Sequence, residues 1–268
     1  MHHASKDRFD PTTTNTLLAG EETLGVPELD PFARQGLITR IHSKLTSGKE
    51  ATVYCCRAHP STNRKFLAAK VYREHVTQAY RRTGVYFEGL ERAMKARTLR
   101  AIGRGTAFGR SAVTGVWMAN EFDALTRLSA AGADVPCPIA QCGSVVLMEY
   151  LGNGARPAPH LDGANLDPGE ARSLFERLLR NVEILLREHL VHGDLSPYNV
   201  LVWKGRPWLI DLPQAVDARF NRSAFDLLAR DIVNVCTFFA RHRVRSDPIE
   251  IAQDLWQRYQ RAELWEID

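Results

Sequence analysis

The segment LVHGDLSPYN, residues 190–199, lies between a helical pattern and a short apolar strand, and it is the strongest signal in the sequence. A second strand follows and ends in Leu-Ile-Asp at residues 209–211. Phosphoryl transfer requires metal ions that neutralise phosphate charge and a base that orients the attacking hydroxyl. Asn199 and Asp211 offer oxygen ligands for a hard cation such as Mg²⁺ from opposite sides of one hairpin. Asp194 stands five residues before Asn199, where a loop can aim it at a hydroxyl. The pattern therefore indicates phosphoryl transfer.

Strands dominate the first half of the chain. Alternating or β-rich apolar runs predict strands over residues 38–43, 51–57, 66–72, 139–142 and 145–150. A single helix is predicted over residues 114–131, where apolar side chains recur at helical spacing up to Gly132. The first three strands are typical of an antiparallel meander.

Helices dominate the second half. Asp167, Pro168 and Glu170 form a capping-box pattern that begins a long helix ending near His189. Two short strands, 200–203 and 207–210, precede two closing helices near 223–242 and 247–262. This order predicts an α+β fold with two lobes around a cleft. We expect a tail over residues 1–36 with an apolar docking segment near 17–18, a first lobe over 37–150, and a reduced helical lobe over 151–268.

Composition excludes several other classes of protein. The 268 residues carry a net charge of +4 and 25% charged side chains, which is ordinary for a soluble domain. Five cysteines without a Cys-x-x-Cys pair argue against a disulfide framework or a structural zinc site. No apolar run approaches the roughly 18 residues that span a bilayer. We therefore expect a cytoplasmic protein that does not bind a membrane.

Basic side chains gather in residues 73–112, where Arg and Lys outnumber Glu and several glycines interrupt any long helix. Two interpretations stay open for this insertion in the first lobe. It is a solvated loop, or it is a patch that meets RNA or an acidic partner.

Six segments resemble the RIO kinases, a group of atypical serine/threonine protein kinases, and are nearest its first subfamily. They are residues 47–51 (SGKEA), 67–72 (LAAKVY), 117–125, 146–150 (VLMEY), 190–201 and 209–216, and the similarity spans about residues 38–240. The resemblance implies the two-lobed protein-kinase-like fold, with an antiparallel sheet and one main helix in the first lobe. It also implies ATP and Mg²⁺ as cofactors, with Mn²⁺ as an alternative, and a protein substrate that the sequence does not identify.

The same resemblance implies where the nucleotide binds. Lys70 would hold the α- and β-phosphates, and Glu121 would fix Lys70 by an ion pair. The remaining nucleotide contacts would come from a short phosphate loop and from the segment that meets adenine: Ser47, Gly48, Lys49, Met148, Glu149 and Tyr150. A lysine on an apolar strand is costly to bury without such a partner.

Catalytic roles also follow from the resemblance. Asp194 would be the catalytic carboxylate, while Asn199 and Asp211 would be metal ligands. Asp231 would brace the catalytic loop from below. His192 is expected to be structural, packing against the loop and hydrogen-bonding to it, and not to act as a base.

Departures from ordinary protein kinases keep three functions open. Only Gly48 remains of the glycine-rich loop, Ser196 stands where a lysine is usual, and Leu212-Pro213 follows Asp211. The first function is a serine/threonine protein kinase, including autophosphorylation. The second is an ATP-driven assembly switch on an RNA–protein particle such as a ribosomal particle, with Asp211 as phosphate acceptor and residues 73–112 touching RNA. The third is a small-molecule kinase of the aminoglycoside or choline type, which shares His-Gly-Asp-Leu-x-Pro-x-Asn.

Overall fold

The computed structural model describes residues 24–73, 100, 104, 106–154 and 156–265. An antiparallel sheet of five strands forms the first lobe in the order β1-β2-β3-β5-β4. Its strands are β1 (Ile38–Ser47), β2 (Ala51–Ala58), β3 (Phe66–Tyr72), β4 (Pro138–Cys142) and β5 (Val145–Glu149). The predicted strands are confirmed, and β1 continues four residues beyond its predicted end.

The central strand β3 shows how the sheet divides two apolar cores. Side chains alternate between the faces of a strand, so Leu67, Ala69 and Val71 lie on one face. Ala68 and Tyr72 lie on the other face, with the main core of the molecule. Lys70 has the same parity as these two residues and therefore points to the side on which the second lobe lies.

Two short helical turns cover the outer face of the sheet, η1 (Pro27–Leu29) and α1 (Asp30–Arg34). Leu29 and Phe32 are fully buried there against Ile38 and Leu67. Burying each such side chain stabilises the fold by about 1.5–3 kcal/mol. The tail predicted for residues 1–36 is therefore wrong over residues 27–34, whereas the docking segment near 17–18 lies outside the described residues.

Helix α4 (Ala107–Ala130) packs on the opposite face of the sheet. It begins seven residues before its predicted start, because the Thr106 hydroxyl accepts a hydrogen bond from the N–H of Gly109 at 3.0 Å. The helix then continues through Gly109 and Gly115 despite their low helix propensity. Most of the basic segment 73–112 lies outside the described residues.

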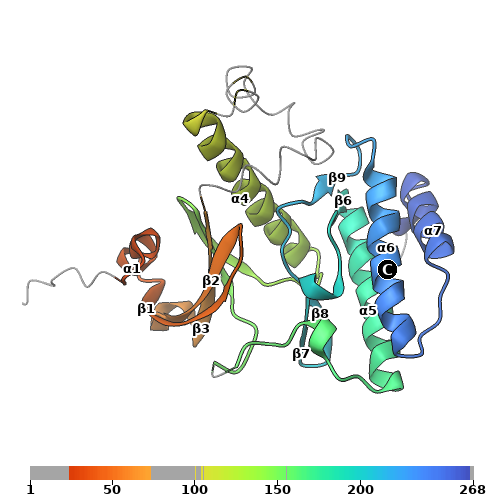
Figure 1. Cartoon of the computed structure of the whole chain (residues 1–268), viewed down its shortest axis with the longest axis horizontal. Coiled ribbons are helices and arrows are strands. Elements are labelled where there is room, and N and C mark those ends of the chain that lie inside the picture. Colours follow the sequence, from red (N-terminus) through yellow and green to blue (C-terminus); the bar gives the residue numbers. More distant parts are fainter. Residues whose placement is uncertain (1–23, 74–99, 101–103, 105, 155, 266–268) are drawn as a thin grey trace, which may run out of the picture.

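The second lobe contains α5 (Pro168–Arg187), α6 (Ala224–Arg241) and α7 (Pro248–Gln260), with η7 (Glu263–Trp265) at its end. Figure 1 shows these helices on one side, the five-stranded sheet on the other, and short strands between them. The predicted capping box at Asp167 is present in full. The α+β, two-lobed prediction is confirmed.

Short strands and turns lie beside the helices of the second lobe. A hairpin joins β7 (Val200–Trp203) to β8 (Arg206–Leu209), and β6 (Leu190–Val191) pairs with β9 (Val216–Asp217). The pairing of β6 with β9 was not predicted, because two-residue strands have no periodicity to detect. The remaining turns are η2 (Pro60–Thr62), η5 (Leu161–Gly163) and η6 (Pro197–Asn199).

A buried polar cluster anchors the connection between α4 and β4 to the second lobe. Asp134 is 5% exposed and accepts from Arg177 Nε at 2.6 Å and Nη2 at 3.0 Å. Asn181 donates to Asp134 Oδ2 at 3.2 Å and accepts from the Asp134 N–H at 2.9 Å. The N–H of Leu209 donates to the Asp134 carbonyl at 2.8 Å. One residue of the first lobe is thus bonded to both α5 and β8, which fixes the lobes relative to each other.

All five cysteines are free thiols, as the sequence predicts. In the part of the chain that the structure describes, no helix is long and apolar enough to cross a membrane.

Candidate active site

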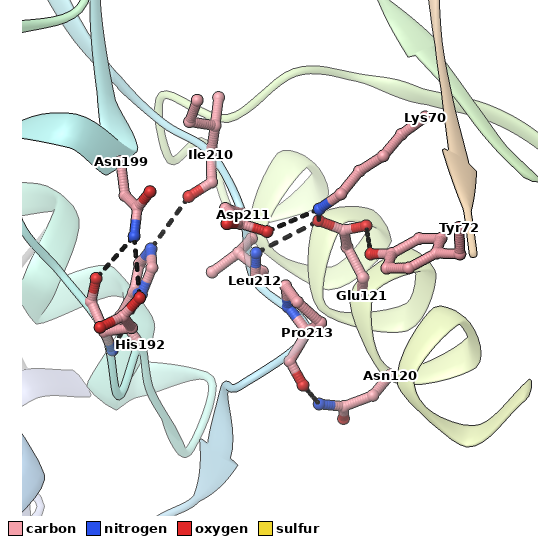
Figure 2. Close-up of polar contacts among 11 residues, drawn as sticks. Lys70, Tyr72, Asn120, Glu121, His192, Asn199, Ile210, Asp211, Leu212 and Pro213 are labelled. Carbon is pink, nitrogen blue, oxygen red and sulfur yellow. Dashed lines mark hydrogen bonds and ion pairs between the residues drawn. The ribbon is translucent and has the colours of Figure 1, made fainter. Parts of the chain in front are cut away.

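Lys70 lies at the centre of the site, between two carboxylates from distant parts of the chain. Its Nζ is 2.6 Å from Oε1 of Glu121 on α4 and 2.6 Å from Oδ1 of Asp211, just after β8 (Figure 2). Lys70 and Glu121 are 9% and 1% exposed. The predicted ion pair between them is present, and the structure adds Asp211 as a second partner.

Burial and charge act in opposite directions on this triad. Burial favours an uncharged lysine, but the negative charges of Asp211 and Glu121 outweigh it and hold the pKa of Lys70 well above its usual value. Burial also acts to raise the pKa of Asp211, yet the Lys70 ammonium outweighs it and lowers that pKa. Lys70 and Asp211 are therefore both charged, so the pair presents a fixed cation and a fixed anion.

Glu121 has two further partners that sequence reasoning missed. The Tyr72 hydroxyl donates to Oε2 of Glu121, and the N–H of Leu212 donates to Oε1 at 3.3 Å (Figure 2). Burial, together with the charge of Glu121, raises the pKa of Tyr72 well above its usual value, so the hydroxyl keeps its proton. Tyr72 stands two residues after Lys70 on one strand, so period-two spacing was a signal for its position.

The catalytic loop places Asp194 beside Asn199 of η6. The Asn199 side-chain amide donates to the Asp194 carbonyl at 2.7 Å and to its carboxylate Oδ2 at 3.2 Å. The amide oxygen of Asn199 is thereby left for a cation. The N–H of Ile210 donates to the Asn199 carbonyl at 3.0 Å, which ties the loop to the segment that carries Asp211. The structure thus links the residues predicted from the LVHGDLSPYN stretch.

His192 has the structural role expected from the sequence. It is 2% exposed, and its Nε2 donates to the Ile210 carbonyl at 3.2 Å. The N–H of Asp194 donates to its Nδ1 at 3.4 Å, so one ring nitrogen donates and the other accepts. Burial lowers the pKa of His192 to about 4, which keeps the ring neutral. A neutral ring with both nitrogens engaged holds the loop and has no free atom for proton transfer.

Asp231 on α6 braces the loop from beneath, as predicted. Its carboxylate accepts from the N–H of Gly193 at 2.8 Å and from the N–H of Leu195 at 2.9 Å. Asn234, one turn further along α6, donates to the Leu195 carbonyl at 3.0 Å, and Arg230 donates to the Gly193 carbonyl. Three residues of one helix therefore fix the backbone on both sides of Asp194.

The turn between β1 and β2 contains the predicted phosphate loop. Lys49 is exposed there, and the N–H of Gly48 donates to the Ala51 carbonyl at 2.9 Å. The Ser47 hydroxyl accepts from Arg73 Nη2 at 2.7 Å and lies 3.2 Å from the Thr52 hydroxyl. Contacts of these three residues with a nucleotide stay a prediction, and the Ser47 hydroxyl already has partners within the protein.

The segment predicted to meet adenine follows from β5. Met148 lies opposite Ala68 in the sheet and is 9% exposed, which suits a pocket wall. The N–H of Glu149 donates to the Cys137 carbonyl at 2.8 Å, and its carboxylate pairs with Arg64 at 3.2 Å. Of the polar groups of Glu149, the backbone carbonyl is therefore the one suited to accept from an adenine amino group. The roles of Glu149 and Tyr150 stay predictions.

The oxygen atoms of the site suit a hard cation that keeps other ligands. Among the described residues, no group of three or more His, Cys, Asp or Glu side chains could hold a metal by itself. Asn199 and Asp211 each offer one side-chain oxygen that is not engaged with the neighbours named above. Mg²⁺ usually takes one or two carboxylates together with waters and substrate phosphates. The residues present therefore fit a magnesium–nucleotide complex better than a cation bound by the protein alone.

Comparison with known proteins places this chain in a family. A sequence profile of the RIO domain matches residues 52–251, about three quarters of the chain. This chain belongs to the RIO family. The serine/threonine-protein kinase rio1 of Schizosaccharomyces pombe is 33% identical over 240 residues, which cover 88% of this chain and 45% of the relative. The RIO-type serine/threonine-protein kinase Rio1 of Thermoplasma acidophilum is 31% identical and covers 72% of this chain and 94% of its own length.

Solved structures agree on the fold of this RIO-family chain. The Rio2 kinase of Chaetomium thermophilum, in an ADP/Mg²⁺–phosphoaspartate complex, superposes with a TM-score of 0.61 at 19% identity. The likeness covers 86% of this chain and 66% of the other. The chain spans about half the length of the first eukaryotic relatives, 45% and 43% for those of Schizosaccharomyces pombe and Caenorhabditis elegans.

Proposed function

We propose that this chain is an ATP- and Mg²⁺-dependent serine/threonine protein kinase of the RIO type. It transfers the γ-phosphate of ATP to a protein hydroxyl, and its own hydroxyls are among the acceptors. The observation that carries the proposal is the bridge from Lys70 to both Glu121 and Asp211, opposite a loop that aligns Asp194 with Asn199. The curated relatives' description as serine/threonine-protein kinases supports the same reaction.

Lys70 and Glu121 bind and orient the nucleotide in this proposal. Glu121 keeps Oε1 on the Lys70 ammonium while Tyr72 occupies Oε2, so the lysine has little rotational freedom. When the α- and β-phosphates arrive, the ammonium exchanges the Asp211 carboxylate for phosphate oxygens. That exchange frees Asp211 for a cation. Ser47, Gly48 and Lys49 cover the phosphates, while Met148, Glu149 and Tyr150 meet the adenine.

Asn199 and Asp211 hold Mg²⁺, and Mn²⁺ is the alternative. The bound cation neutralises charge on the phosphate oxygens. The Asn199 amide keeps its oxygen turned outward because both hydrogens of its nitrogen are engaged by Asp194. Asp211 supplies a full negative charge, because Lys70 keeps its pKa low.

Asp194 accepts the hydrogen bond of the incoming hydroxyl and orients its oxygen toward the γ-phosphate. Burial and the nearby charge of Asp211 raise the pKa of Asp194 above its usual value. A carboxylate with a raised pKa is a better proton acceptor than an exposed aspartate. Asp231, Arg230 and Asn234 hold the loop so that this geometry needs no rearrangement during the reaction.

A second candidate function is an ATPase-type assembly switch in which Asp211 accepts the phosphate. The Rio2 neighbour solved with phosphoaspartate supports it, and the Asp211 side chain is 40% exposed here. A partner RNA or ribosomal particle would bind through the basic segment 73–112.

The small-molecule kinase loses support because the chain belongs to the RIO family. We further propose a cytoplasmic location and a lobe boundary near residue 150.

The experiment that tests this is incubation of the purified chain with ATP labelled on its γ-phosphate and Mg²⁺, without added substrate. An Asp194→Ala variant serves as the control. Acid-stable label on serine or threonine, absent from the variant, supports the protein kinase. Label that is released by hydroxylamine and survives in the variant supports the Asp211 switch instead. A chain that neither becomes labelled nor releases ADP, alone or with RNA, contradicts both functions.

A further inference from the structure

A short turn follows Asp211, and a single side chain of α4 holds it. The Nδ2 of Asn120 donates to the Pro213 carbonyl at 3.1 Å and to the Ala215 carbonyl at 3.0 Å. Figure 2 shows this amide directed at Pro213 from the helix. The turn closes on itself where the N–H of Ala215 donates to the Leu212 carbonyl at 3.1 Å. Both hydrogens of one amide thus bind the two carbonyls that the turn presents to α4.

The neighbouring residue on α4 binds the same turn. Glu121 accepts from the N–H of Leu212 at 3.3 Å while it pairs with Lys70. Two consecutive helix residues therefore bind the backbone immediately after Asp211, one through an acceptor and the other through donors. Further along the chain, β9 is fixed by its pairing with β6. The turn is thus bound at Leu212, Pro213 and Ala215.

The backbone at Asp211 explains why such binding is needed. Asp211 has φ +67°, the left-handed region that residues with a side chain rarely adopt. Strained conformations of this kind persist only when the surroundings over-determine them. Lys70 constrains the Asp211 side chain, whereas Asn120 and Glu121 hold the backbone that follows. Pro213 has no N–H, so the turn cannot be held through an amide at that position.

We propose that Asn120 is a positioning residue that keeps Asp211 in the conformation required to bind the cation. This inference rests on the proposed function, because the role of Asp211 as a metal ligand is part of that proposal. Asn120 and Glu121 make the position of Asp211 depend on α4, the helix that also fixes Lys70. Where ordinary kinases have Phe-Gly after the metal-binding Asp, this chain has Leu212-Pro213. The side-chain amide of Asn120 on α4 binds this turn.

The test compares Asn120→Asp with the wild type. Aspartate has the same shape as asparagine, but it donates nothing and sets its oxygens against two carbonyl oxygens. Asn120→Ala removes the donors without adding charge, in case the aspartate variant fails to fold. Thr126→Ala is the matched control, because this α4 hydroxyl donates only to the Phe122 carbonyl of its own helix. Affinity for ADP is measured twice, in saturating Mg²⁺ and in excess EDTA, and hydrogen exchange is followed at the amides of Leu212 and of residues 214–216.

Loss of two neutral hydrogen bonds predicts about tenfold weaker ADP binding in Mg²⁺. Affinity in EDTA should stay within about twofold of the wild type, because Lys70 and Glu121 remain. The amides of Leu212 and of residues 214–216 should exchange faster, while those of the sheet and α5 keep the wild-type rates. Thr126→Ala should match the wild type in every measurement.

Two outcomes overturn the proposal. One is wild-type exchange at residues 212–216 together with unchanged Mg²⁺ dependence in both Asn120 variants. The other is faster exchange throughout the chain with equal losses in Mg²⁺ and in EDTA, which would mean that Asn120 only stabilises the fold. A wild-type chain that binds no ADP in Mg²⁺ contradicts the proposed function. The exchange data then still decide whether Asn120 holds the turn.

Discussion

Asp211 and Asp194 are carboxylates of one site, but the structure holds them by different means. Asp211 is held by charge, since the Lys70 ammonium on a distant strand binds its side chain at 2.6 Å. Asp194 is held through its backbone, since Asp231 fixes the amides on both sides of it, while Asn199 donates a hydrogen bond to its carboxylate. In the proposed function, one acid would therefore exchange its partner for a ligand, and the other would stay where it is. Substitutions should therefore affect the two acids differently.

Asp211→Asn should have the largest effect. The amide cannot pair with the charge of Lys70 and offers a cation only a neutral oxygen, so phosphoryl transfer should fall by about a thousandfold or more. The variant should also bind ADP no more tightly in Mg²⁺ than in EDTA. Single-turnover transfer and ADP titrations check both. Asp226→Asn, on the exposed face of α6, is the control and should behave as the wild type. Transfer within tenfold of the wild type would contradict the metal role of Asp211.

Asp194→Asn sharpens the contrast, because the same chemical change should separate transfer from binding. Removing a general base lowers the rate by about 10²- to 10⁴-fold. Asp194 is not bonded to Lys70, so ADP affinity in Mg²⁺ should stay within about twofold of the wild type. Parallel measurements of label transfer and ADP affinity check this. Equal losses in both would mean that Asp194 holds the cation and that the two acids are not distinct.

Asp231→Asn tests the support of Asp194 without touching either acid. One amide oxygen can replace one acceptor, but the NH₂ group then faces a backbone N–H. Loss of one of the two hydrogen bonds should lower the free energy of unfolding by about 1–3 kcal/mol. It should also reduce phosphoryl transfer about tenfold. ADP binding through Lys70 and Asp211 should persist. The measurement is urea unfolding beside label transfer, with Asp226→Asn as control. A variant that loses ADP affinity as strongly as transfer would show that the brace supports both sides of the site.

Sequence reasoning found the parts of this site that follow a local pattern. The paired strands, the capped helix α5 and the spacing of Asp194, Asn199 and Asp211 are all readable from neighbouring residues. The helix at 30–34 escaped because five residues give too little periodicity, and its core position depends on a sheet formed later in the chain. The amide of Asn120 gave no signal, since its partners lie more than 90 residues away.

The same limit applies to the cluster around Asp134, whose acceptors and donors come from α5 and β8. A buried aspartate in a connection gives no local hint of its partners. Lys70 shows the opposite case, because a lysine inside an apolar strand requires a charged partner wherever that partner lies. From the sequence it is therefore easy to predict that a buried charge has a partner. It is harder to predict which neutral side chain holds a turn.

The last expected effect concerns stability and its dependence on pH, and it separates Asp231 from Asp194 and Asp211. Burial raises the pKa of Asp231 to about 7, although the N–H groups of Gly193 and Leu195 and the charge of Arg230 oppose this, while Asp194 adds to it. The ordinary pKa of an aspartate is 3.8, so between about pH 4 and pH 7 the folded chain binds more protons at this group than the unfolded chain. This contribution to stability therefore falls as pH rises through that window and is constant above it. The urea midpoint of the wild type should exceed that of Asp231→Asn by the largest amount near pH 4. This difference should be smallest just above pH 7. A difference that grows with pH would show that the two N–H groups keep Asp231 ionised, so that the brace, like Asp211, is held by its charge.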